Sequence, residues 1–271
     1  MNVIERNLQE IGKSLLVTLP KSWTNSLKLK KGSKIKIMIS EQGNLLIAPE
    51  FVKKQSLNQE TTIIFDEFFS KRFFKAYFHG YDKIIINFKD RHDGLYEFLK
   101  KFMNVQIIEE SSSRVVVKVF KIDELSIQEC LKRMFFLSIN MFDEVGNKSK
   151  LQELRISLIK FYYMLVMQIR RFLSEGKYTE ENQISLIKAM DYRMIAEKIE
   201  RISGVLLNLK KDSYLVQIKE FYSDSFNYFI NEEFDKSLGL LKQEKILLNK
   251  IKNKDLLEIL KYAKNIGMLI K

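Results

Sequence analysis

The spacing of apolar residues changes twice along the chain and predicts three kinds of structure in succession. Residues 1–50 contain short runs in which apolar and polar positions alternate, the period of a β-strand with one buried face. Residues 51–123 mix strand-like and helix-like stretches, and from residue 124 onwards the apolar spacing is helical. The pattern predicts a multidomain α+β protein, with a β-rich domain at 1–50, a small α/β connector at 51–123 and an all-α helical bundle at 124–271.

The first fifty residues predict the order strand, turn, strand, short helix, strand, turn, strand. Gly12 and Gly43 each interrupt a β-type run, as tight hairpin turns require. Apolar residues recur at every second position, which predicts one buried face; they include Leu15, Val17, Leu19, Ile35, Ile37 and Ile39. Because so short a chain hides too little surface to fold alone, we expect this domain to dimerise through that face.

The connector predicts a small α/β unit. We expect helices at residues 66–79 and 93–103, a strand at 83–88, and a hairpin that pairs 105–110 with 114–120.

The last part of the chain predicts about six helices. Glycine or polar clusters suggest breaks near residues 146–149, 174–179, 210–213, 231–232 and 253–254. In one expected helix the apolar residues follow steps of four and three and form a single stripe: Ile195, Ile199, Ile202, Leu206 and Leu209. Segments 196–209 and 260–271 resemble each other, which favours two three-helix units.

The charge balance favours a polyanionic partner. The chain has 46 lysines and arginines against 34 acids, a formal net charge of +12. Solvated faces of lysine-rich helices explain such a surplus equally well. Within residues 1–50, however, eight cations face four acids, so the surplus is four per chain and eight per dimer. Contacts of such a surface with nucleic acid would depend steeply on salt.

The order of motifs in the first fifty residues resembles the SpoVT-AbrB family. The match covers about residues 3–49 and rests on RNLQEIGKSLLVTLPK, the short helix after it, LKLKKG and a closing hairpin. The resemblance implies that two chains interleave their hairpins into one swapped-hairpin β-barrel, which docks basic residues on DNA. The residues assigned to this DNA-binding surface are Arg6, Lys13, Lys21, Lys28, Lys30 and Lys31.

The helical part resembles PhoU-type phosphate-uptake regulators, particularly archaeal proteins that carry a SpoVT-AbrB domain ahead of PhoU-like helices. The likeness rests on segments 125–145, 158–173 and 189–209. It implies a link to phosphate uptake and a docking surface for a transporter or signalling protein.

PhoU-type proteins bind metal clusters through acids one helical turn apart, and that pattern is eroded in this chain. Gly204 and Met268 stand where acids are expected. The acids that remain are Asp143, Glu144, Glu197 and Glu200. They are weak candidates for a divalent or trivalent metal, because such glutamates more often pair with neighbouring cations. No other cofactor is expected.

Few residues suited to catalysis are present, so we expect no enzyme. The chain has two histidines, His79 and His92, and one cysteine, Cys130, and it lacks the common phosphate-binding and zinc-binding motifs. We expect His79 to cap a helix end and Cys130 to pack in a core. Without an apolar leader or a long apolar span, the sequence predicts a cytoplasmic protein that does not insert into membranes.

Together these observations predict a homodimeric transcriptional regulator that binds double-stranded DNA. The alternative is an adaptor whose barrel only dimerises, while its PhoU-like helices regulate a transporter or signalling partner.

Overall fold

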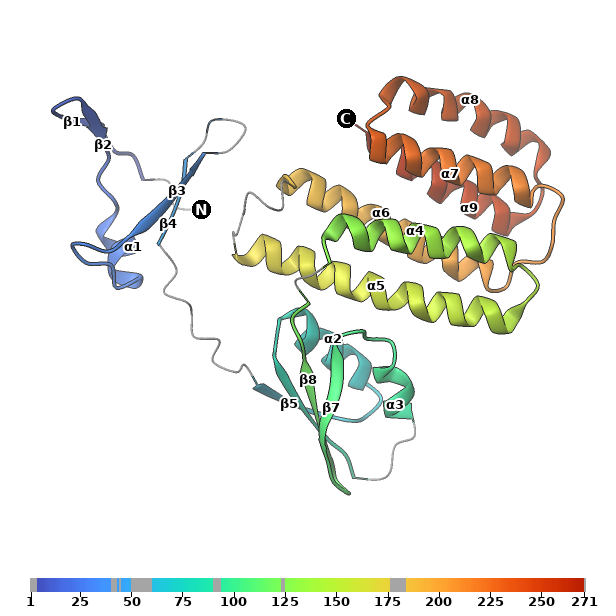
Figure 1. Cartoon of the computed structure of the whole chain (residues 1–271), viewed down its shortest axis with the longest axis horizontal. Coiled ribbons are helices and arrows are strands. Elements are labelled where there is room, and N and C mark those ends of the chain that lie inside the picture. Colours follow the sequence, from blue (N-terminus) through green and yellow to red (C-terminus); the bar gives the residue numbers. More distant parts are fainter. Residues whose placement is uncertain are drawn as a thin grey trace. The chain divides into compact units, whose positions relative to one another are not determined.

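The structure, a computed structural model, describes residues 4–39, 43, 45–49, 60–89, 94–122, 125–175 and 184–270 (Figure 1). Its internal contacts divide the chain into an N-terminal unit, Met1–Leu57, and a C-terminal unit, Asn58–Lys271. Residues 50–59 and 123–124 lie outside the described residues. The boundaries expected between three domains therefore stay a prediction.

The N-terminal unit contains two hairpins and one short helix. Strands β1 (Gln9–Ile11) and β2 (Ser14–Leu16) pair antiparallel, α1 spans Lys21–Ser26, and β3 (Ile35–Ile39) pairs antiparallel with β4 (Leu45–Pro49). The two hairpins form separate two-stranded sheets. Within the described residues of this single chain there is no closed barrel. The element order matches the expectation from the sequence, whereas a swapped barrel would require a second copy.

The C-terminal unit begins with a four-stranded sheet and two helices. Its elements are β5 (Glu60–Ile64), α2 (Phe69–Phe78), β6 (Lys83–Asn87), α3 (Gly94–Leu99), β7 (Val105–Glu110) and β8 (Arg114–Val119). The strand order is β5-β6-β8-β7, with β5 parallel to β6 and the other pairs antiparallel. The α/β character and the β7–β8 hairpin are confirmed, and β5 is an additional strand.

An aromatic cluster joins this sheet region to the helices that follow. Phe73 and Tyr77 of α2 are fully buried, and the ring of Phe102 lies 5.0 Å from that of Phe73. On its other side Phe102 stacks on Tyr163 at 5.0 Å between ring centroids, and Met167 belongs to the same core. Because Tyr163 and Met167 lie on α5, the core of the sheet region continues into the helical bundle.

Six helices form the rest of the C-terminal unit as the structure describes it. They are α4 (Ile127–Asp143), α5 (Lys148–Glu175), α6 (Leu186–Leu206), α7 (Leu215–Asn231), α8 (Phe234–Lys250) and α9 (Lys254–Gly267). Helices α4, α5 and α6 pack on one another, and so do α7, α8 and α9. Contacts of α6 with α9 and of α4 with α7 join the two groups.

Local sequence explains where several helices begin. The Ser126 hydroxyl accepts a hydrogen bond from the Glu129 backbone N–H, and the Glu129 carboxylate accepts one from the Ser126 N–H. This reciprocal capping satisfies two donors that the first turn of α4 would otherwise leave unpaired. Ser185 and Asn253 cap α6 and α9 more simply, because each only accepts backbone N–H bonds through its side-chain oxygen.

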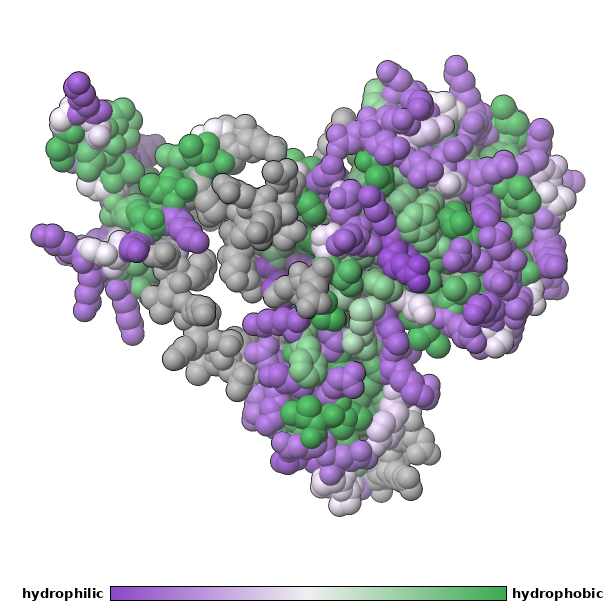
Figure 2. Space-filling model, viewed as in Figure 1, coloured by the Kyte–Doolittle hydropathy of each residue, from purple (hydrophilic) through white to green (hydrophobic). Residues whose placement is uncertain are grey.

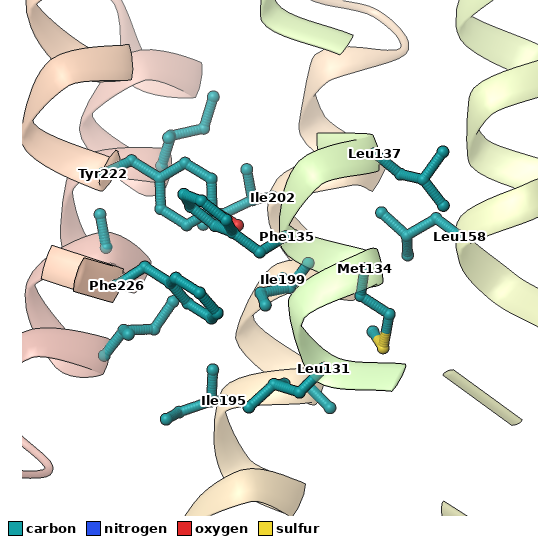
Figure 3. Packing of buried hydrophobic residues seen from close by; sticks show 14 of the residues in the cluster. Leu131, Met134, Phe135, Leu137, Leu158, Ile195, Ile199, Ile202, Tyr222 and Phe226 are labelled. Atoms are coloured by element: carbon teal, nitrogen blue, oxygen red, sulfur yellow. The ribbon is translucent and has the colours of Figure 1, made fainter. Parts of the chain in front are cut away.

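The apolar stripe predicted on the third helix of the bundle is confirmed for its first four members, whereas Leu209 lies beyond the end of α6 at Leu206. All five of its members are buried, and Ile195, Ile199 and Ile202 face α4 in the close-up of the core (Figure 3). Phe135 of α4 stacks on Phe226 of α7 with 3.9 Å between ring centroids. This stack and its neighbours hold the two helix groups together.

Two single-residue predictions are also confirmed. His79 ends α2, where its ring Nδ1 donates to the Lys75 carbonyl at 2.7 Å. Cys130 is fully buried, and burial raises the pKa of its thiol to about 12. His92 lies outside the described residues.

Among the helices that the structure describes, none is both long and apolar enough to span a bilayer.

Candidate nucleic-acid interface

The first group of predicted DNA contacts lies at the β1–β2 hairpin. Arg6 lies in the segment that leads into β1, and Lys13 follows Gly12 in the two-residue turn between the strands. Gly12 has a φ of +65°, a conformation that suits glycine and makes the tight turn possible. Both cationic side chains are exposed, and Lys13 lies at the tip of the hairpin.

The second group lies at α1 and in the loop after it. Lys21 is the first residue of α1, directly after Pro20. Lys28, just after the C-cap residue Leu27, has a left-handed φ of +54°, and Gly32 has a φ of +85°. Lys30 and Lys31 follow in a turn, in which Ser33 accepts from the Lys30 N–H through its hydroxyl and donates its own N–H to the Lys30 carbonyl. One short loop therefore presents three of the six predicted cations.

These cations have no anionic partners within the part of the N-terminal unit that the structure describes. None of the six forms an ion pair there, and all six side chains are exposed. Lys34 and Lys36 are exposed too and extend the group along β3, although the sequence reasoning did not assign them to the site. Lys36 alternates with Ile35 and Ile37 and so lies on the opposite face of β3. That alternation was the signal that could have identified it.

The described residues of the N-terminal unit do not bury the apolar face of that unit. No described side chain of this unit is buried, and Leu15, Ile37 and Ile39 are 68%, 59% and 76% exposed. Hydrophobic residues accordingly lie on the surface of this unit (Figure 2). Isolated two-stranded hairpins are at best marginally stable in water. The described residues of a single N-terminal unit therefore form no core of their own that would hold the hairpins in place.

Each of the four acids proposed as weak metal ligands has a side-chain partner of its own. Asp143, at the end of α4, accepts from Lys219 of α7 at 2.6 and 2.8 Å. Glu144 accepts from the side-chain amide of Asn147 at 3.1 Å. On α6, Glu197 pairs with Arg201 at 2.8 Å, one of the neighbours expected from the sequence.

Glu200 has a partner that sequence reasoning missed. Arg155 of α5 donates to the Glu200 carboxylate at 2.8 Å, to the Glu200 carbonyl at 3.1 Å and to the Ser203 hydroxyl at 2.6 Å. A Cβ atom at position 204 would lie 3.3 Å from Nη1 of Arg155. The guanidinium therefore occupies the space beside Gly204, the position at which the sequence resemblance led us to expect an acid.

This donor set does not fit a metal cluster. Three of the four acids are bound to cationic side chains, and Arg155 places positive charge beside the α6 pair. In the parts of the chain that the structure describes, no three histidine, cysteine or acidic side chains converge as metal ligands would.

Comparison of the chain with protein-family models, with curated proteins and with solved structures finds no match.

Proposed function

We propose that this chain is a DNA-binding transcriptional regulator that acts as a homodimer and is linked to phosphate uptake. The observation that carries the proposal lies in the described residues of the N-terminal unit, where exposed cations without a described ion-pair partner occur together with an apolar face that the unit does not bury. A second copy would cover the apolar face, and duplex DNA would neutralise the cations.

The need for a core favours the dimer. Leu15 of the first hairpin and Ile37 and Ile39 of the second are all more than half exposed in the single chain. Burying apolar surface stabilises a fold by about 25 cal/mol per Å². Strands with free edges can also pair with strands of another chain. Interleaved hairpins, as in the SpoVT-AbrB family that the sequence resembles, would bury the face and pair the edges.

The charge of that dimer favours duplex DNA as the partner. Residues 1–50 carry eight cations and four acids, so a dimer has a surplus of eight positive charges there. Lysine and arginine that contact phosphates release condensed counterions, which drives binding with little dependence on base sequence. The hairpin tip with Lys13 and the loop with Lys28, Lys30 and Lys31 would make such phosphate contacts.

The link to phosphate uptake rests on the resemblance of the helical segments to PhoU-type regulators. In this proposal the helices respond to a phosphate-related signal or to a partner protein. Because the metal pattern is eroded, that response would not require a metal cluster.

Gel-shift titration of the full chain against genomic fragments tests the proposal. We expect binding at about 50 mM salt that weakens steeply by about 200 mM, and a marked loss for the double variant Arg6→Gln with Lys13→Gln. The double variant Lys242→Gln with Lys245→Gln, which neutralises two exposed cations on α8, serves as the matched control. Absence of binding at about 50 mM salt, or equal losses in both variants, would exclude the proposal.

One observation favours the second candidate, an adaptor that does not bind DNA. Helix α8 leaves a row of apolar side chains 38–49% exposed along one side: Phe234, Leu238, Leu241 and Leu248. Their steps of four, three and seven place them on one helix face, which would suit a partner protein. If Leu238→Glu abolished regulation in cells while Arg6→Gln with Lys13→Gln left it intact, the adaptor would be the correct function.

A further inference from the structure

A cavity of about 520 Å³ lies within the C-terminal unit, between the sheet region and α5. Three segments line it: the turn from α2 to β6 at residues 78–82, the end of β8 at 119–121, and α5 between 167 and 173. Much of its wall is apolar, and includes Phe78, Tyr81, Phe120 and Met167. A volume of this size is typical of sites for small organic molecules, which span about 300–1,000 Å³.

A buried polar network fixes the back wall of the cavity. Asn104 is 2% exposed, accepts from the Tyr77 hydroxyl at 2.7 Å and donates its amide to the Phe120 carbonyl at 2.7 Å. The Phe120 N–H donates in turn to the Asn104 carbonyl at 2.7 Å, and the Asn104 amide lies 3.8 Å from the Met167 sulfur. The buried Asn104 amide thus holds two lining residues, Phe120 and Met167, in place. This part of the wall is therefore formed before any ligand binds.

Positive charge surrounds the cavity. Lys121, Arg170 and Arg171 line it, against a single acid, Asp82. Lys121 and Arg170 are exposed, and among the described residues no carboxylate pairs with either. The Arg170 guanidinium lies 5.9 Å from the centroid of the Phe78 ring, which keeps it against the aromatic wall. The cavity therefore combines an apolar wall with two cations, Lys121 and Arg170, that no described carboxylate neutralises.

We propose that this cavity binds a small organic anion with a flat aromatic body. The aromatic and sulfur-containing wall would take the flat body, and Lys121 and Arg170 would take the anionic group. Nucleotides and aromatic carboxylates share this chemistry, because each joins a planar ring system to a phosphate or carboxylate. A bare inorganic anion would leave the apolar wall empty, and a neutral aromatic molecule would leave the cations unpaired.

This site does not depend on the proposed DNA binding. All the lining residues belong to Asn58–Lys271, whereas the predicted DNA contacts belong to Met1–Leu57. The variant Arg6→Gln with Lys13→Gln should therefore bind the small anion as the unmodified chain does, even if DNA binding is lost.

Titration calorimetry on the full chain at about 150 mM salt tests the proposal with four probes: adenosine monophosphate, adenosine, inorganic phosphate and naphthoate. We expect saturable binding of the nucleotide, of naphthoate or of both, and at least about tenfold weaker binding of adenosine and phosphate. Comparing adenosine monophosphate with naphthoate shows whether the site prefers a nucleotide or an aromatic carboxylate. Saturable binding of neither aromatic anion at millimolar concentration would overturn the proposal.

Matched variants locate the binding. The double variant Lys121→Gln with Arg170→Gln should weaken it by about tenfold or more, because charge-assisted hydrogen bonds are lost. Lys242→Gln with Lys245→Gln removes the same charge from α8 and should leave binding unchanged. Phe120→Ala should weaken the binding of the aromatic anions and leave the weak binding of inorganic phosphate unchanged. Equal losses in the cavity and control variants would show non-specific charge binding and overturn the site.

Discussion

Replacing Arg155 by alanine should destabilise the helical bundle more than replacing an ordinary surface arginine. Its guanidinium donates three hydrogen bonds, two of them to Glu200, and the side chains of this pair are only 20% and 27% exposed. Hydrogen bonds to charged groups contribute about 1.5–3 kcal/mol each, whereas neutral ones contribute about 1 kcal/mol. The Glu200 carbonyl keeps a bond from the Ser203 hydroxyl at 2.6 Å, so that acceptor stays satisfied. The expected loss is therefore about 2–3 kcal/mol, mainly from the carboxylate.

Urea unfolding followed by far-UV circular dichroism measures this loss. With a slope of about 2 kcal/mol per M, the midpoint should fall by about 1 M. Arg201→Ala is the matched control, because Arg201 also pairs with an acid of α6 but at a more exposed position. The control should lower the midpoint by less than half as much. If Arg155→Ala were no more destabilising than Arg201→Ala, the argument that Arg155 is a built-in cation of the bundle would be refuted.

Three further predictions concern other parts of the molecule. Asn104→Ala should lower the free energy of unfolding by about 1–3 kcal/mol, because it leaves the buried Tyr77 hydroxyl without its partner; a loss below about 0.5 kcal/mol in urea unfolding would contradict this. Because burial raises the pKa of the Cys130 thiol from 9.0 to about 12, the stability that the protonated thiol contributes is complete below pH 9 and is lost as the pH rises towards 12. The urea midpoint should therefore be lower at pH 10.5 than at pH 7, and this drop should be smaller in Cys130→Ala. An equally large drop in that variant would show that the thiol is not the cause. Ile37→Glu should shift the full chain from dimer to monomer in light scattering after size-exclusion chromatography; an unchanged dimer mass would place the interface elsewhere.

Helix positions in the last part of the chain could be predicted because their apolar spacing and their breaks are local features. The break expected near Asn231 appears where α7 ends and Glu232 adopts a left-handed φ of +57°. The break expected near Asn253 appears where that residue caps α9. Such signals depend on a few neighbouring residues, so one sequence is enough to read them.

Strand β5 was missed because its evidence is not local. Within Glu60–Ile64 only Ile63 is buried, and the strand is held mainly by its parallel pairing with β6, about twenty residues further along the chain. Two adjacent threonines and a glutamate give no clear alternation. The pairing partner decides that this segment is a strand, and periodicity cannot show it.

The residues of the candidate sites could be predicted from the sequence, but the side chains that they contact could not. The exposed cations of the N-terminal unit could be read directly, because turns and short loops place lysines in solvent. Arg155 could have been recognised as unusual, because it lies four residues after Leu151 and three before Leu158, both buried on α5. A cation on an apolar stripe requires an acceptor on a facing helix, but which helix faces α5 depends on the tertiary fold.

The most direct test of the central claim is the salt dependence of duplex binding by the full chain. Each phosphate contact contributes about 0.9 to the slope of log affinity against log salt concentration. We expect a steep slope whose magnitude falls by about 2–4 when Arg6 and Lys13 are both replaced by glutamine in each copy of the dimer. The slope should stay unchanged in Lys242→Gln with Lys245→Gln. A slope that is the same in all three proteins, or no duplex binding at about 50 mM salt, would contradict it.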